Sequence, residues 1–314
     1  MMFARALCEW LGFKVSASAR YACLMLVCLA LQACATPAGN LNKLAQEQGF
    51  SRETVNAAGY KLLVYKNRQA VAGFPANADN SILHVYLEGD GSPWRHRVFI
   101  MADPTPRRPL MLELMKLDRQ PSVYLGRPCY NGTSMEKPCT NALWTSGRYS
   151  PAVIESMASG LNDLQRRHQA SELWLFGHSG GGALAMLLAA RLPDVTRIVT
   201  IAGNLDTQAW TRHHGYTPLF SSLNPVKQPD LRKSVWQWHL LGGRDAVIPP
   251  PLVRPFIMRQ SQASGFQFDR FSHGCCWQLV WSEVLEALAL DEPKRIPARQ
   301  FKYPDSLLDA SESR

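Results

Sequence analysis

The chain of 314 residues has no block of lysine and arginine, no basic helical stripe and no internal repeat. Its formal charge is +9, but a nucleic-acid-binding surface normally gathers its positive charge in one place. No phosphate-binding loop and no set of metal ligands is visible either. We therefore expect no nucleic-acid partner, no cofactor and no metal. The 46% hydrophobic and 19% charged residues predict a globular protein with a sizeable core.

Residues 1–33 have the organisation of an export signal, a basic stretch followed by an apolar one that is too short to span a membrane comfortably. Residues 31–34, Leu-Gln-Ala-Cys, resemble a bacterial lipobox. The resemblance implies cleavage before Cys34, a lipid-modified Cys34 and, because Ala35 rather than Asp follows, an outer-membrane protein that faces the periplasm. The alternative is an ordinary secretory signal cleaved between Ala33 and Thr36. In both cases the mature chain is exported.

The most informative stretch is residues 173–188, an apolar run, then Gly-His-Ser-Gly-Gly, then an Ala/Leu-rich helical pattern. Gly177, Ser179 and Gly181 fill the pattern G-x-S-x-G, which places a serine at a sharp turn between a strand and a helix. Small neighbours relieve crowding there, and the helix N-terminus faces developing negative charge. A glycine-rich turn that only packs, or only binds an anion, is the alternative reading.

The remaining pattern alternates strands with helices, which predicts a mostly parallel sheet with helices on both faces. We expect residues 34–54 to be a polar tether, residues 55–290 to be the folded domain and residues 291–314 to be a polar tail. Residues 204–230 are long enough to form a cap or lid. The expected strands are 60–65 (at the sheet edge), 81–87, 122–125, 173–176, 197–203, 234–241 and 266–268; the expected helices are 110–117, 151–168, 251–262 and 277–290.

Two residues past later strands complete a catalytic pattern. Asp245 lies in Gly-Gly-Arg-Asp-Ala-Val-Ile-Pro, and His273 lies in Phe-Ser-His-Gly. With Ser179 they follow the order nucleophile, acid, base, so residues 55–290 resemble the α/β-hydrolase superfamily. The resemblance implies that Ser179 attacks a carbonyl carbon, His273 takes its proton and Asp245 orients the imidazole. Asp206 is the alternative acid.

Among the other histidines, His84 and His239 are expected in packed strands and His178 in a structural role. His213 and His214 belong to the cap candidate and are alternative bases.

An oxyanion hole needs two backbone N–H donors. Gly180, the first residue after the serine, is one candidate. The turn Glu-Gly-Asp-Gly-Ser-Pro-Trp at 88–94 follows an early strand, where α/β hydrolases place the second donor. Lipases often have His-Gly at this point, whereas this chain has Glu88-Gly89. We expect the donor to be the N–H of Asp90, with Gly89 as second choice.

Four cysteines remain after export and lipidation, and four cysteines allow three connectivities. A Cys129–Cys139 disulfide, which closes a short loop, is the first choice; Cys275 and Cys276 would then be free or form a vicinal disulfide. Alternatively, the two pairs cross-link. A zinc site and a cysteine nucleophile fit the compartment and the pattern poorly.

Together these features predict an envelope-anchored serine hydrolase that cleaves carboxylic esters, of esterase or lipase type. The expected partners are a small-molecule or lipid-like ester and the membrane, through the N-terminal lipid. A peptidase or thioesterase of the same fold, or a non-catalytic lipoprotein that retains the scaffold, are the alternatives. The intact Ser179, Asp245 and His273 favour the enzyme.

Overall fold

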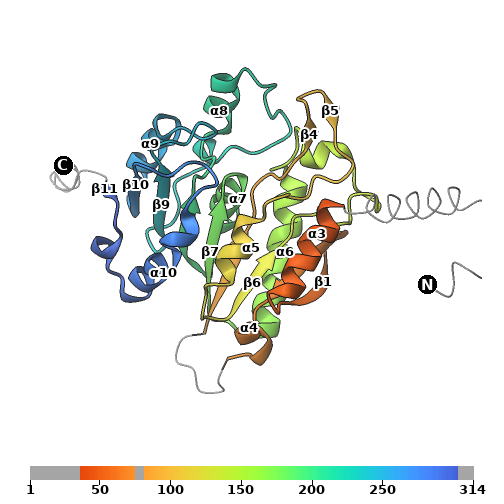
Figure 1. Cartoon of the computed structure of the whole chain (residues 1–314), viewed down its shortest axis with the longest axis horizontal. Helices are drawn as coiled ribbons and strands as arrows, with labels where there is room; N and C mark the ends of the chain where they lie inside the picture. Colours follow the sequence, from red (N-terminus) through yellow and green to blue (C-terminus); the bar gives the residue numbers. More distant parts are fainter. Residues whose placement is uncertain (1–35, 75–80, 303–314) are drawn as a thin grey trace, which may run out of the picture. The chain divides into compact units, whose positions relative to one another are not determined.

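The computed structural model describes residues 36–74 and 81–302, so the signal segment and Cys34 lie outside the described residues. Its centre is a nine-stranded sheet in the order β1-β2-β6-β3-β7-β8-β9-β10-β11 (Figure 1). A separate hairpin, β4-β5, follows β3. The strands are β1 Ser51–Ala57, β2 Tyr60–Lys66, β3 Ile82–Leu87, β4 Trp94–Arg95, β5 Phe99–Ile100, β6 Ser122–Leu125, β7 Glu172–His178, β8 Val195–Ile201, β9 Trp236–Gly242, β10 Ala263–Phe268 and β11 Arg299–Lys302.

The six strands from β6 to β10 in the sheet order are parallel to one another, and the antiparallel strands β1, β2 and β11 lie at the two edges. Strands β3, β6 and β7 are buried over almost their whole length. A parallel strand that is covered by helices on both faces has a nearly continuous apolar sequence. Strands β3, β6 and β7 are mostly apolar, as this burial requires. The predicted mostly parallel sheet is confirmed.

Helices cover both faces of this sheet (Figure 1). Helices α6, α7 and α9 pack in one apolar cluster with the sheet, and α3, α5 and α10 pack in the other. The α-helices are α3 Pro37–Glu47, α4 Arg68–Ala72, α5 Leu110–Met115, α6 Pro151–His168, α7 Gly180–Ala189, α8 Thr207–His214, α9 Pro250–Arg259 and α10 Trp281–Leu290; short 3-10 turns span Asn141–Trp144, Pro225–Lys227, Trp277–Leu279 and Pro293–Arg295.

Helix α6 shows how closely local sequence sets these elements. Its apolar residues recur at helical spacing and are buried. The Ser150 hydroxyl accepts the N–H of Val153, and Pro151 occupies the first helical position. The helix ends where Gln169 adopts a left-handed conformation with φ 53°. Its predicted bounds, 151–168, match the structure.

The N-terminal part of the domain differs from the expected polar tether. Residues 37–47 form α3, whose Leu41 and Ala45 are fully buried against the sheet. Residues 51–57 form β1, which takes the sheet edge in place of the strand at 60–65. Two buried side chains one helical turn apart are enough to dock this short helix, although its overall composition is polar.

The C-terminal part also extends further than expected. Strand β11 pairs antiparallel with β10, so the predicted tail begins with an ordered edge strand. Residues 303–314 lie outside the described residues. None of the helices in residues 36–74 and 81–302 has the length and apolar character needed to span a membrane.

Candidate active site

Ser179 stands at the sharp turn between β7 and α7. Its backbone has φ 53° and ψ −118°, a strained conformation that few side-chain-bearing residues adopt. A Cβ at Gly177 would lie 2.2 Å from the carbonyl oxygen of Gly181, and a Cβ at Gly181 would lie 2.1 Å from that of Leu87. The turn therefore closes only with glycine at both positions. The predicted strand, turn and helix are all present.

His273 and Asp245 meet at the same edge of the sheet, past β10 and β9. The Nδ1 of His273 lies 2.9 Å from Oδ2 of Asp245, whose side chain is fully buried. The other oxygen of Asp245 accepts the N–H groups of Val247 and Ile248, each at 2.8 Å. These bonds fix the carboxylate, which in turn fixes the imidazole. With Nδ1 engaged, Nε2 is the ring nitrogen free to accept a proton.

The environment keeps His273 uncharged at neutral pH. Burial lowers its pKa below the usual value, and the neighbouring His178, whose ring centroid lies 4.8 Å away, acts in the same direction. The hydrogen bond to Asp245 opposes both effects without cancelling them. A neutral imidazole can take a proton from a serine hydroxyl, whereas an imidazolium cannot.

Asp206, the alternative acid, is a helix cap and does not contact His273. Asp206 caps α8, where its Oδ1 accepts the N–H groups of Gln208 and Ala209 and the side-chain amide of Asn224. These bonds commit the carboxylate to the end of the helix. The structure therefore brings Asp245, and not Asp206, to His273.

Four other histidines have structural contacts. His84 contacts Asp118 at 2.7 Å inside the core, and His239 is buried beside Thr200. His178 bonds through Nε2 to the carbonyl oxygen of His273, which braces the histidine loop. His214 bonds to the carbonyl oxygen of Val247 and so ties α8 to the Asp245 loop.

The two expected oxyanion donors come from the residue directly after the serine and from the loop after β3. Gly180 is the first residue of α7, so the helix cannot satisfy its N–H. The N–H of Gly89 donates to the carboxylate of Glu88 at 2.9 Å. The N–H of Asp90 has no acceptor within residues 36–74 and 81–302. The geometry thus leaves the Asp90 N–H available and occupies the Gly89 N–H.

A charged cluster beside Gly180 was not visible in the sequence. The carboxylate of Asp90 accepts hydrogen bonds from Arg127 at 2.8 Å, from Arg148 at 2.9 Å and from the Tyr149 hydroxyl at 2.6 Å. A Cβ at Gly180 would lie 1.9 Å from this carboxylate, so the cluster packs directly against the turn. The only signal in the sequence was that Arg127 and Arg148 lie in the loop that follows the strand at 122–125.

The cluster is charged at neutral pH. Burial by itself would raise the pKa of Asp90, but Arg148, Arg127 and the Tyr149 hydroxyl outweigh it and lower the pKa from 3.8 to about 2. Burial, together with the charge of Asp90, raises the pKa of Tyr149 well above its usual value, so its hydroxyl remains a donor. Guanidinium groups do not lose their protons in proteins. Two buried positive charges therefore face one negative charge.

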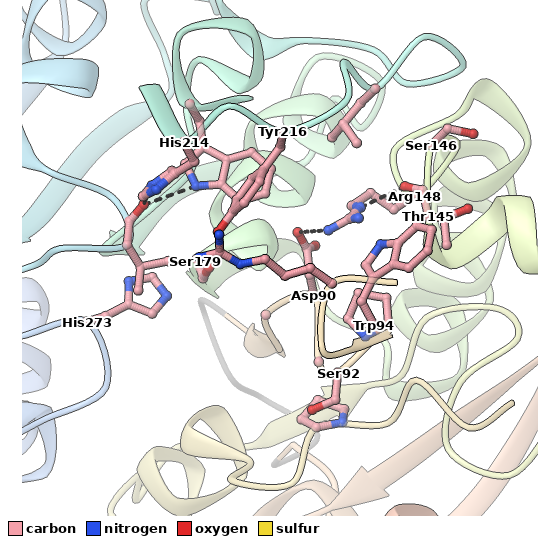
Figure 2. A pocket seen from close by; sticks show the side chains of 18 of the residues that line it. Asp90, Ser92, Trp94, Thr145, Ser146, Arg148, Ser179, His214, Tyr216 and His273 are labelled. Atoms are coloured by element: carbon pink, nitrogen blue, oxygen red, sulfur yellow. Dashed lines mark hydrogen bonds and ion pairs between the residues drawn. The ribbon is translucent and has the colours of Figure 1, made fainter. Parts of the chain in front are cut away.

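These groups surround a cleft of about 920 Å³. Figure 2 shows His273 and Ser179 on one side of the cleft, Arg148 and Trp94 on the other, and Asp90 between them. The cap candidate contributes Trp210, His214 and Tyr216 from α8 and the residues after it. Trp94 and Trp210 also line the cleft, whereas Trp144 and Trp277 are buried in the core.

The cysteines pair within each segment. Cys129 and Cys139 form a disulfide that closes the loop after β6, which agrees with the first choice from the sequence. Cys275 and Cys276 form a vicinal disulfide just after His273. The cross-linked alternative is not found.

Comparisons with known proteins agree with the fold described above. The family model Lipase (class 3) matches residues 126–198, which run from the end of β6 through the serine turn into β8. No curated protein matches the sequence.

Among solved structures, the Pyrococcus furiosus esterase Pf2001 superposes with a TM-score of 0.55 at 15% identity, over 80% of this chain and 92% of that one. Puromycin hydrolase gives 0.53 at 16% identity, over 80% of this chain and 40% of that one, and Est1E from Butyrivibrio proteoclasticus gives 0.50 at 11%, over 77% and 98%. At such identities the likeness shows the fold alone. The protein has the α/β-hydrolase fold, and one segment that includes the serine turn is similar to class 3 lipases.

Proposed function

We propose that the protein is a serine hydrolase that cleaves carboxylic esters, with Ser179 as nucleophile, His273 as general base and acid, and Asp245 as the orienting carboxylate. The observation that carries the proposal is the bond between a fully buried Asp245 and His273 in the cleft that also exposes Ser179. A carboxylate held by two backbone N–H groups and aimed at a histidine serves no packing purpose that an apolar residue would not serve better.

The reaction follows from these positions. Ser179 Oγ attacks the ester carbonyl while its proton passes to Nε2 of His273. The N–H groups of Gly180 and Asp90 stabilise the resulting oxyanion, and one such donor is typically worth about 3 kcal/mol. The intermediate expels the alcohol, which takes the proton from His273. Water then attacks the acyl-enzyme by the same route, which releases the acid and restores Ser179.

Labelling with a fluorophosphonate probe tests this assignment. We expect the wild type to be labelled and Ser179→Ala to remain unlabelled. Asp245→Asn should label at least 100-fold more slowly, because His273 loses the partner that fixes its tautomer. Asp206→Asn is the matched control: it removes a carboxylate past the neighbouring strand and should label at the wild-type rate.

Other outcomes would count against the proposal. Labelling that survives in Asp245→Asn but is lost in Asp206→Asn would move the acid to Asp206. A folded, oxidised wild type without labelling would favour a non-catalytic scaffold. Faster turnover of matched amides or thioesters than of esters with graded acyl length would identify a peptidase or a thioesterase instead.

The proposed site of action is the bacterial cell envelope, with the protein anchored through lipid on Cys34 in the outer membrane and facing the periplasm. The lipobox-like residues 31–34 support this. Metabolic labelling with an alkyne analogue of palmitate should mark the wild type and spare Cys34→Ala. A wild type that stays unlabelled and is found in the soluble periplasmic fraction would leave only the ordinary secretory signal.

A further inference from the structure

The mouth of the cleft carries three arginines that form no ion pair with the described residues. Arg97 extends from the β4-β5 hairpin, and Arg107 and Arg108 precede α5. All three are exposed, and none forms an ion pair with any residue in the described parts of the chain. The Arg97 guanidinium lies 5.6 Å from the ring centroid of Tyr216, which reduces its conformational freedom at the rim.

The guanidinium of Arg148, a fourth arginine, also lines the cleft. Arg148 is almost completely buried; its Nε donates to the carbonyl oxygen of Thr145 and its Nη1 donates to Asp90. Its Nη2 has no hydrogen-bond partner in residues 36–74 and 81–302, and the residue lines the cleft opposite Ser179 (Figure 2). Two of the three donor nitrogens thus hold the group in place, and the third is left for a ligand.

The acidic residues of the cleft do not neutralise this charge. Among the described residues, Glu88 and Asp90 are the only acidic ones that line it. The carboxylate of Glu88 accepts the N–H groups of Gly89 and Met111, and Asp90 is shared between two buried arginines. The cleft is therefore lined by four guanidinium groups, from Arg97, Arg107, Arg108 and Arg148, and by only two carboxylates in the described residues, and this excess of positive charge attracts anions.

We propose that the ester bound here carries an anionic group, a carboxylate or a phosphate, held by Arg148 Nη2 and by the rim of Arg97, Arg107 and Arg108 while Ser179 attacks the ester carbonyl. This inference rests on the proposed esterase function and names its substrate class. Guanidinium groups bind carboxylate and phosphate oxygens through paired hydrogen bonds, and an excess of arginine is the arrangement that this recognition needs. A neutral ester would leave the Nη2 donor and three rim charges without a partner.

Two matched substrate pairs test the proposal and distinguish the position of the anion. Mono-4-nitrophenyl glutarate and 4-nitrophenyl pentanoate differ only by an acyl-side carboxylate. Octanoylglycerol 3-phosphate and octanoylglycerol differ only by an alcohol-side phosphate. At low salt we expect kcat/KM to be at least 10-fold higher for the anionic member of one pair. Raising the salt to 0.5 M should reduce this preference, because exposed charges are screened.

The rim variants Arg97→Gln, Arg107→Gln and Arg108→Gln should lower the ratio of anionic to neutral kcat/KM, chiefly through a higher KM, and the triple variant should lower it most. Arg119→Gln is the control: Arg119 is exposed, lies in the loop before β6 and does not line the cleft. This variant loses the same charge away from the cleft. Its ratio of anionic to neutral kcat/KM should therefore equal that of the wild type.

The failures of the two proposals can be told apart. Fluorophosphonate labelling and hydrolysis of neutral esters, with no preference for either anionic member, would overturn the anionic substrate and keep the hydrolase. A preference that survives in the triple rim variant would also overturn it. No labelling and no turnover of any of the four esters would overturn the esterase function itself.

Discussion

The cluster of Asp90, Arg127 and Arg148 makes a quantitative prediction about stability. Asp90→Asn keeps the shape of the side chain but leaves two buried guanidinium groups without a counter-charge. The removal of one partner from a buried ion pair costs about 3–5 kcal/mol. The contacts at 2.8 Å and 2.9 Å and the burial of both arginines place this site in that class. We expect Asp90→Asn to lower the free energy of unfolding at pH 7 by about this amount.

The same cluster predicts how that loss depends on pH. The folded pKa of Asp90 is about 2, below the ordinary value of 3.8. A carboxyl with a lowered folded pKa stabilises the protein above its unfolded pKa and loses this contribution as the pH falls through the folded pKa. The difference in stability between wild type and Asp90→Asn should therefore be constant above pH 5. It should shrink by about 2 kcal/mol between pH 4 and pH 2.

Urea denaturation followed by tryptophan fluorescence, at steps from pH 7 to pH 2, measures both quantities. Asp163→Asn is the matched control, because Asp163 also bonds to two arginines, Arg166 and Arg167, but on the exposed face of α6. Such a surface pair is worth about 1 kcal/mol or less. The reasoning is refuted if Asp90→Asn costs no more than the control, or if its cost does not change between pH 4 and pH 2.

Three further outcomes are expected. Because the pKa of His273 is lowered, the acidic limb of the pH profile of kcat/KM should have its midpoint below 6.5; a midpoint above 7 in steady-state assays would contradict this. Gly181→Ala should lower Tm sharply, because its Cβ would lie 2.1 Å from a carbonyl oxygen of β3. Gly274→Ala is the control and should leave Tm unchanged, because no atom lies within 4 Å of its Cβ. Equal Tm values in thermal melts of the two variants would refute the argument. Serine at both Cys129 and Cys139, ten residues apart, should cost about 3 kcal/mol in urea titrations by the loop-entropy model, and an unchanged midpoint would rule out a stabilising disulfide.

Local sequence predicted well the parts of the fold that depend on local interactions. The bounds of α6 followed from its apolar period and its Ser150 cap, and the serine turn followed from glycines that sterics demand. Asp245 and His273 were found because chemistry-bearing residues past parallel strands meet at one edge of the sheet. The order of these residues along the chain, and their positions directly after strands, were enough to predict that Asp245 and His273 interact.

Other features depend on contacts between segments that are distant in sequence. The Asp90 cluster joins the loops after β3 and β6, and no periodicity links residue 90 to residues 127 and 148. Helix α3 was missed because its polar composition concealed Leu41 and Ala45. Strand β11 was missed because its ladder to β10, and not its composition, makes it a strand. Glu88 occupies the position where lipases often have histidine, and its carboxylate accepts the N–H of Gly89, which favours the Asp90 N–H over that of Gly89 as the oxyanion donor.

If Cys34 carries the proposed lipid, the helix that replaces the expected tether limits how far the domain can lie from the membrane. The N–H of Ala38, four residues after Cys34 in the sequence, donates to the carboxylate of Asp103, and Ala38 is part of α3. An extended chain covers about 3.5 Å per residue, so a lipid on Cys34 would hold the domain within about 14 Å of the bilayer surface. A flexible tether of twenty residues would have allowed about 70 Å. The enzyme would then be confined to the layer of solution directly above its own membrane, and substrates would have to come from that membrane or pass close to it.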